Sequence, residues 1–99
     1  MIAGVYNIKI QGLGFFPKSG LLSIRLVDSQ ISGSITLYGK ELPLNYGTFL
    51  GENIELEGDI PLSVGKINYS GKGTIKDGVL NLILETEKGQ LIVTGKKRG

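Results

Sequence analysis

The chain has 99 residues, of which 40% are hydrophobic and 20% charged, and its formal net charge is +2. This length suits one domain, residues 1–99, and the composition is globular rather than disordered or collagen-like. The chain contains no Cys and no His. Disulfides, thiol nucleophiles, the usual zinc sites and imidazole acid–base chemistry are therefore excluded.

The first expected strand begins at the N-terminus. Tyr6, Ile8 and Ile10 alternate there with Asn7, Lys9 and Gln11. Because successive side chains of a strand point to opposite faces, this period of two predicts a half-buried strand. No segment of the chain has a convincing helical pattern.

The next segments repeat the same alternation. Residues 22–26 and 31–37 are separated by Asp28-Ser29 and are expected to form a hairpin. Gly39-Lys40 and Gly51-Glu52 are expected to turn the chain into the fourth and fifth strands. Leu42, Leu44 and Tyr46 share one face of the fourth strand, and Pro43 predicts a bulge or an unpaired position in it.

The second half of the chain supplies three more strands. Residues 65–76 are expected to form the longest one, with Tyr69 on its inward face and Gly71 and Gly73 allowing it to bend. Asp77-Gly78 is the clearest hairpin signal in the chain, because both positions of a type I′ turn need positive φ. Residues 79–86 and 90–97 complete the set.

Eight strands joined mostly by short links predict sequential antiparallel neighbours. Closing them removes both sheet edges, so the expected fold is all-β, an eight-stranded antiparallel up-and-down β-barrel. A sandwich of two four-stranded meanders is the alternative.

Two short motifs resemble the calycin-type barrels, the architecture of lipocalins, avidins and fatty-acid-binding proteins. Gly4-Val5-Tyr6 is similar to the Gly-x-Trp that opens lipocalins, with Tyr in place of Trp. The segment 94–98, Thr-Gly-Lys-Lys-Arg, lies where lipocalins place a basic side chain over that aromatic residue. The resemblance implies a lipocalin-like barrel whose first loop covers the open end. Tyr6 itself is expected to be a core plug at the closed end.

The expected interior is lined by Ile and Leu, with Tyr46 and Tyr69 added. An eight-stranded barrel is either filled by its side chains or just wide enough for one small molecule. The exception to the short links is the segment 12–20, which carries Phe15 and Phe16. These aromatics either fold back and complete the core or contact an apolar ligand or partner. The predicted ligand-binding residues are therefore Phe15, Phe16, Tyr46 and Tyr69.

The last hairpin, residues 79–84 and 91–93, is apolar on both faces. A barrel strand that faces water is expected to be polar on its outer side. Val79, Asn81, Ile83 and Ile92 are therefore the predicted interface of a homodimer, since a same-patch contact is the commonest way to cover such a face.

The charged residues alternate along two neighbouring expected strands. Glu55, Glu57 and Asp59 alternate along the fifth expected strand, and Lys66, Lys72 and Lys76 along the sixth. Cross-strand ion pairs are expected rather than a calcium site, because the loop spacing of an EF-hand is missing.

Three functional classes can be compared, which are an interaction or structural module, a ligand-binding module and an enzyme. The expected function is a non-enzymatic oligomeric interaction or structural module, and the alternative is a binding protein for a small apolar ligand at the barrel mouth. No motif pairs acids or lysines for catalysis, and the lysines do not cluster as on nucleic-acid-binding faces. No metal, cofactor, nucleic acid or membrane is expected, and the expected location is cytoplasmic.

Overall fold

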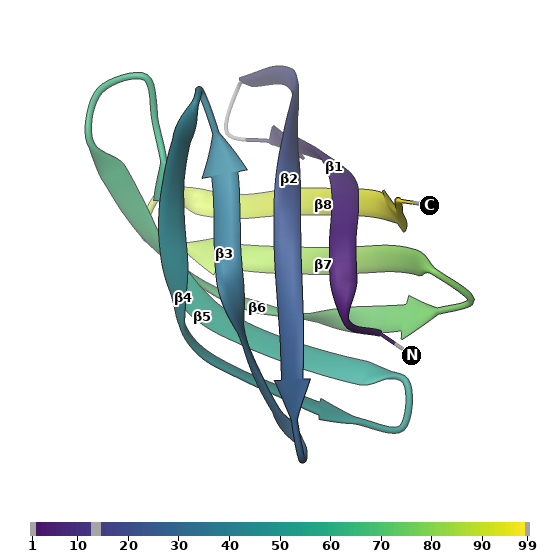
Figure 1. Ribbon diagram of the computed structural model, residues 1–99. Coiled ribbons are helices and arrows are strands. Elements are labelled where there is room, and N and C mark those ends of the chain that lie inside the picture. The colour runs from purple at the N-terminus through teal and green to yellow at the C-terminus, as the bar shows by residue number, and fades with distance from the viewer. Residues whose placement is uncertain (1, 13–14, 99) are drawn as a thin grey trace.

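The structure is a computed structural model that describes residues 2–12 and 15–98, with the backbone alone at residues 15 and 16. It contains eight strands, which are β1 (Gly4–Gly12), β2 (Phe15–Val27), β3 (Gln30–Leu37), β4 (Lys40–Leu50), β5 (Asn53–Pro61), β6 (Lys66–Lys76), β7 (Val79–Thr86) and β8 (Gly89–Lys97). Each strand pairs with the next, and β1 pairs with β8 (Figure 1). The predicted eight-stranded antiparallel up-and-down barrel is confirmed, and the two-sheet sandwich is wrong. The described part of the chain has no helix long and apolar enough to cross a membrane.

The pairing of the first and last strands closes the barrel. Its register is continuous from Tyr6 opposite Lys97 to Gly12 opposite Leu91. The closed sheet is flattened, with principal extents of 34 × 25 × 19 Å. In Figure 1, β2, β3 and β4 run across the direction of β7 and β8 behind them. Two walls therefore press their inward side chains against each other.

A β-bulge in β4 overturns the predicted inward position of Tyr46. Leu44 lies opposite Gly58 on β5, whereas Tyr46 lies opposite Glu57, so β4 has one extra residue at Asn45. An extra residue reverses the facing of every side chain beyond it. Tyr46 consequently points outward and is half exposed, while Phe49 packs against the core.

The segment predicted as a long first loop is mostly strand. β2 begins at Phe15 and, at 13 residues, is longer than the 11-residue β6 that was expected to be the longest. Ile10 lies opposite Lys18 and Gly12 opposite Phe15, so β2 has one extra residue between Phe15 and Lys18, in the stretch that contains Pro17. A bulge accommodates proline because its missing N–H is not needed in the ladder there.

The turns agree closely with the sequence. Asp77 and Gly78 both have positive φ, of 53° and 75°, as the predicted type I′ turn requires. The β3–β4 turn is displaced by one residue from the prediction. It is formed by Tyr38 and Gly39, with φ of 56° and 70°, and Lys40 already belongs to β4.

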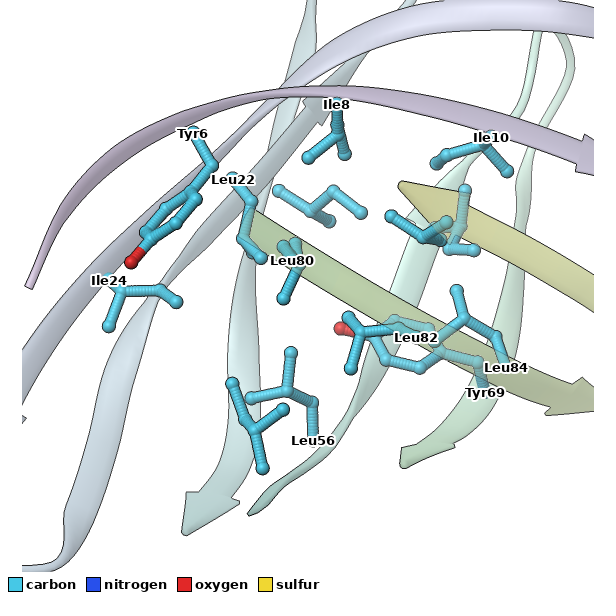
Figure 2. Close-up of a cluster of buried hydrophobic side chains, with 14 of the residues drawn as sticks. Tyr6, Ile8, Ile10, Leu22, Ile24, Leu56, Tyr69, Leu80, Leu82 and Leu84 are labelled. Carbon is cyan, nitrogen blue, oxygen red and sulfur yellow. The ribbon is translucent and has the colours of Figure 1, made fainter. Parts of the chain in front are cut away.

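The core consists of buried aliphatic side chains from every strand except β4 together with two tyrosines, and Leu44 and Phe49 of β4 pack against it while partly buried. Figure 2 shows part of it, with Tyr6 and Tyr69 among Ile and Leu side chains. Both tyrosines are fully buried. The Tyr6 hydroxyl donates a hydrogen bond to the Ile2 carbonyl oxygen at 2.7 Å, whereas the Tyr69 hydroxyl has no partner among the described residues. Tyr6 is therefore packed in the core, as predicted.

The first prediction concerns Gly73, where β6 and β7 approach closely. A Cβ at this position would collide with the Asn81 carbonyl oxygen and crowd the Leu82 Cα on β7. We expect Gly73→Ala to lower the free energy of unfolding by about 3 kcal/mol, because backbone atoms must move apart. Denaturant unfolding measures the loss. The exposed neighbour Ser70 is the control, and Ser70→Ala should stay within about 0.5 kcal/mol of the unmodified protein. Equal effects of the two substitutions would contradict the close approach.

The second prediction compares the two buried tyrosines. Tyr6→Phe leaves the Ile2 carbonyl without its donor and should cost about 1–2 kcal/mol of unfolding free energy. Tyr69→Phe removes a hydroxyl that has no partner and should leave stability unchanged or raise it. Thermal unfolding of both variants provides the measurement. A loss in Tyr69→Phe as large as that in Tyr6→Phe would mean that the Tyr69 hydroxyl is hydrogen-bonded in solution.

Candidate functional site

The barrel interior is the first place where a ligand could bind. Its described side chains are hydrophobic, and no charged or polar residue among them is buried. The internal cavity, which touches Leu56, Tyr69 and Leu82, leaves about 10 Å³ for the centre of a water-sized molecule. That is about the limit for a single water. The described interior is therefore a packed core. This corresponds to the alternative in which the barrel is filled by its own side chains.

Tyr69 is one of the residues that line this cavity, whose lining is apolar. It lies opposite Gly58 on β5, and a Cβ built on Gly58 would come within 3.2 Å of the Tyr69 hydroxyl oxygen. The absence of a side chain at Gly58 thus makes room for the tyrosine. Tyr69 is predicted as a ligand-binding residue, and its inward position is confirmed.

The chemistry open to Tyr69 is limited by its surroundings. Burial raises the pKa of the Tyr69 hydroxyl well above its ordinary range, and the Asp59 carboxylate raises it further. Burial also raises the pKa of Tyr6. Because both hydroxyls stay neutral at physiological pH, they can donate hydrogen bonds but cannot act as bases.

The structure does not bring the predicted ligand residues together. Tyr69 lies inside the barrel, whereas Tyr46 lies on the outer surface and is 50% exposed. The two tyrosines are on opposite sides of the barrel wall because of the bulge at Asn45. The side chains of Phe15 and Phe16 lie outside the described residues.

The outer side of β7 and β8 is the second place of interest. We use the name hairpin face for the outward side chains of these two strands, which are Val79, Asn81, Ile83, Glu85, Gln90, Ile92, Thr94 and Lys96. Ile83 and Ile92 are direct cross-strand partners. They are 48% and 46% exposed. Two large aliphatic side chains therefore lie together at the surface.

The surroundings of this isoleucine pair are polar. Ile92 lies opposite Gln11 on β1 and Ile83 opposite Lys72 on β6. Val79 is also 41% exposed, but Asn81 separates it from Ile83 along β7. The four predicted interface residues are thus all outward and exposed, and their apolar centre is the pair Ile83 and Ile92.

A surface hollow borders the hairpin face. It has a volume of about 470 Å³ and is lined by residues that include Tyr46, Glu57, Ser70, Ile83 and Glu85. Ser70 Oγ donates to Glu57 at 3.4 Å, and Gln90 Nε2 donates to Glu85 at 2.6 Å. The described residues contain no group of three acids that could hold a metal ion. The hollow is an acidic, partly apolar trough.

Sequence reasoning missed this hollow because it placed Tyr46 inside. A signal was available in the spacing of Leu44 and Phe49. Positions five apart cannot share a face of an uninterrupted strand, because the side-chain period is two. Two core-type residues at that spacing indicate one extra residue between them.

Comparisons with known proteins support the fold. No family model matches the chain, and no curated protein matches it. A solved structure described as a redesigned β-barrel is similar, with a TM-score of 0.73 and 13% sequence identity over 99% of this chain and 92% of that one. At this identity the similarity concerns architecture alone. The chain is an all-β protein that forms a closed, eight-stranded antiparallel up-and-down barrel.

Proposed function

We propose that this barrel is a non-enzymatic interaction module that forms a homodimer through its hairpin face. The observation that carries the proposal is the directly paired, half-exposed Ile83 and Ile92. They lie over strands whose inward side chains, Leu82, Leu84 and Leu91, already complete the core. The isoleucines are therefore not needed inside, and a second protein surface is a reason for them to be apolar.

The energetics favour a weak dimer. Burying the exposed half of an isoleucine contributes about 1 kcal/mol, so four such side chains in a symmetric dimer contribute about 4 kcal/mol. Loss of translational and rotational freedom costs about 4 kcal/mol or more. The hydrophobic term alone balances only the lower end of this cost, and the dimer needs polar contacts in addition.

The proposal assigns no catalytic role to the barrel. Three of its acids, Asp59, Glu55 and Glu52, are in ion pairs with lysines. Glu57 and Glu85 accept hydrogen bonds from neutral side chains. With no His or Cys in the chain, a general acid–base pair would have to come from carboxylates, lysines and tyrosines alone.

A small apolar ligand at the barrel mouth that reaches into the interior is the second candidate. The unpartnered Tyr69 hydroxyl favours it, because such a group gains a hydrogen bond when a ligand supplies an acceptor. The 10 Å³ cavity opposes it, since any ligand larger than a water would have to displace core side chains. A ligand would reveal itself as extra mass on gently purified protein.

We also propose that the barrel is of calycin type. In support, Lys97 of the basic C-terminal segment lies opposite Tyr6 of the Gly4-Val5-Tyr6 motif on neighbouring strands. This is the pairing that the resemblance to lipocalins implies. The cytoplasmic location and the absence of membrane and nucleic-acid partners stay predictions of the sequence.

The third prediction tests the hairpin face directly. The double variant Ile83→Lys, Ile92→Lys places two charges at the centre of the proposed contact in each copy and should leave the protein monomeric. Native mass spectrometry reports the subunit number, and circular dichroism checks that the barrel is folded. Val27→Lys serves as the control, because Val27 is exposed on β2, away from the hairpin face. A double variant that dimerises like the unmodified protein would refute this interface.

A further inference from the structure

The outward charged side chains around the hairpin face divide into those that form ion pairs and those that do not. Three lysines of β6 are neutralised by acids, in the pairs Lys66–Asp59 at 3.4 Å, Lys72–Glu55 at 3.7 Å and Lys76–Glu52 at 3.5 Å. The expected cross-strand pairing is confirmed for Asp59 and Glu55, while Glu57 faces Ser70 instead. Among the residues that the structure describes, Glu57, Glu85, Lys9 and Lys96 are in none of these ion pairs, and their positions can be mapped by register.

These charges are separated by sign along the strand direction. On one side of the isoleucine pair lie Glu85 and Glu57, in the register row that contains Gln90 and Ser70. On the other side lie Lys96, opposite Val79, and Lys9, opposite Thr94. One end of the surface is therefore acidic and the other basic, with the apolar pair between them.

The turn residues at the two ends preserve this separation. Asp77, in the β6–β7 turn, is an acid at the basic end, but Lys9, Lys96 and Arg98 outnumber it there. At the acidic end, Glu87 and Lys88 in the β7–β8 turn offset each other. The basic end stays positive and the acidic end stays negative.

A surface with this distribution is complementary to itself in only one orientation. A two-fold axis that lies in the interface and crosses the strands reverses the strand direction, so the acidic end of one copy meets the basic end of the other. An axis parallel to the strands would place Glu85 against Glu85 and Lys96 against Lys96. The charges thus favour antiparallel strands across the interface.

The spacing of the residues is consistent with this orientation. At about 3.3 Å per residue, Glu85 lies about 7 Å from the isoleucine row and Lys96 about 13 Å from it on the other side. An axis about 3 Å from the isoleucines, towards Asn81 and Thr94, places Glu85 and Lys96 at equal distances of about 10 Å along the strands. Because Glu85 is on β7 and Lys96 on β8, the two side chains are offset sideways by one strand spacing of about 4.8 Å, which a small tilt of the axis removes. The isoleucines of both copies then lie within about 7 Å of one another along the strands.

We propose that the second copy binds antiparallel on the hairpin face, with Glu85 of each copy against Lys96 of the other. The proposal rests on the homodimer proposed above and adds its symmetry and its polar contacts. The two strands of the hairpin face together with their neighbours β6 and β1, each about 26 Å long and about 4.8 Å apart, offer about 500 Å² per copy. Standard interfaces bury about 800 Å² per partner, so this contact belongs to the weak class and depends on its charges.

Charge reversal tests the arrangement. In Glu85→Lys or Lys96→Glu alone, both symmetry-related contacts become repulsive, and the dimer dissociation constant should rise about tenfold at low ionic strength. The double variant exchanges the two charges and should dimerise like the unmodified protein. A mixture of the two single variants, one of them isotopically labelled, should form heterodimers in preference to either homodimer. Native mass spectrometry and sedimentation equilibrium measure these populations.

The controls make each outcome decisive. Glu41→Lys and Arg25→Glu change the net charge equally but lie on β4 and β2, and they should leave the dissociation constant unchanged. Single reversals without effect, or a double variant as weak as the single ones, would overturn the antiparallel arrangement. If Ile83→Lys, Ile92→Lys still abolishes the dimer in that case, the hairpin face stands and its orientation is wrong. An unmodified protein that is monomeric throughout would overturn the homodimer itself.

Discussion

Closure of the ladder between β1 and β8 is the constraint on which the rest of the molecule depends. Once Tyr6 is held opposite Lys97 and Gly12 opposite Leu91, every strand has two hydrogen-bonded neighbours. A closed sheet has no free edge with which to recruit another strand. Edge-to-edge pairing is therefore closed to this barrel, and the proposed association uses outward side chains on the faces of strands.

Closure also determines what the interior can do. The two walls of a flattened eight-stranded barrel bring Ile and Leu side chains into contact, and little space is left around Tyr69. For this reason the proposed function uses the outer surface of the barrel and not its interior. The isoleucine pair and the sorted charges of the hairpin face are the features there that a self-contained barrel does not require.

Most of the architecture could be predicted from the sequence, because the alternation in β1, β3, β5, β6 and β7 is uninterrupted and turns such as Asp77-Gly78 have one preferred conformation. The predictions for Tyr46 and for the segment around Pro17 were wrong for a common reason. A bulge adds one residue to a strand, and the position of that residue depends on the neighbouring strands. The alternation of residues along a single strand contains no information about those neighbours. The outward positions of Val79, Ile83 and Ile92 needed no such information, since β7 and β8 have no bulge. The sorting of charges also needed the register between strands.

Sedimentation equilibrium of the unmodified protein over a wide concentration range, paired with native mass spectrometry, tests whether the barrel is a self-associating module with a packed interior. We expect a reversible equilibrium between monomer and dimer, with a dimer that weakens as salt is added and with masses equal to one and two chains and nothing more. A monomer at every concentration would contradict the proposed interface. A reproducible extra mass per subunit would contradict the packed interior and direct attention to Tyr69.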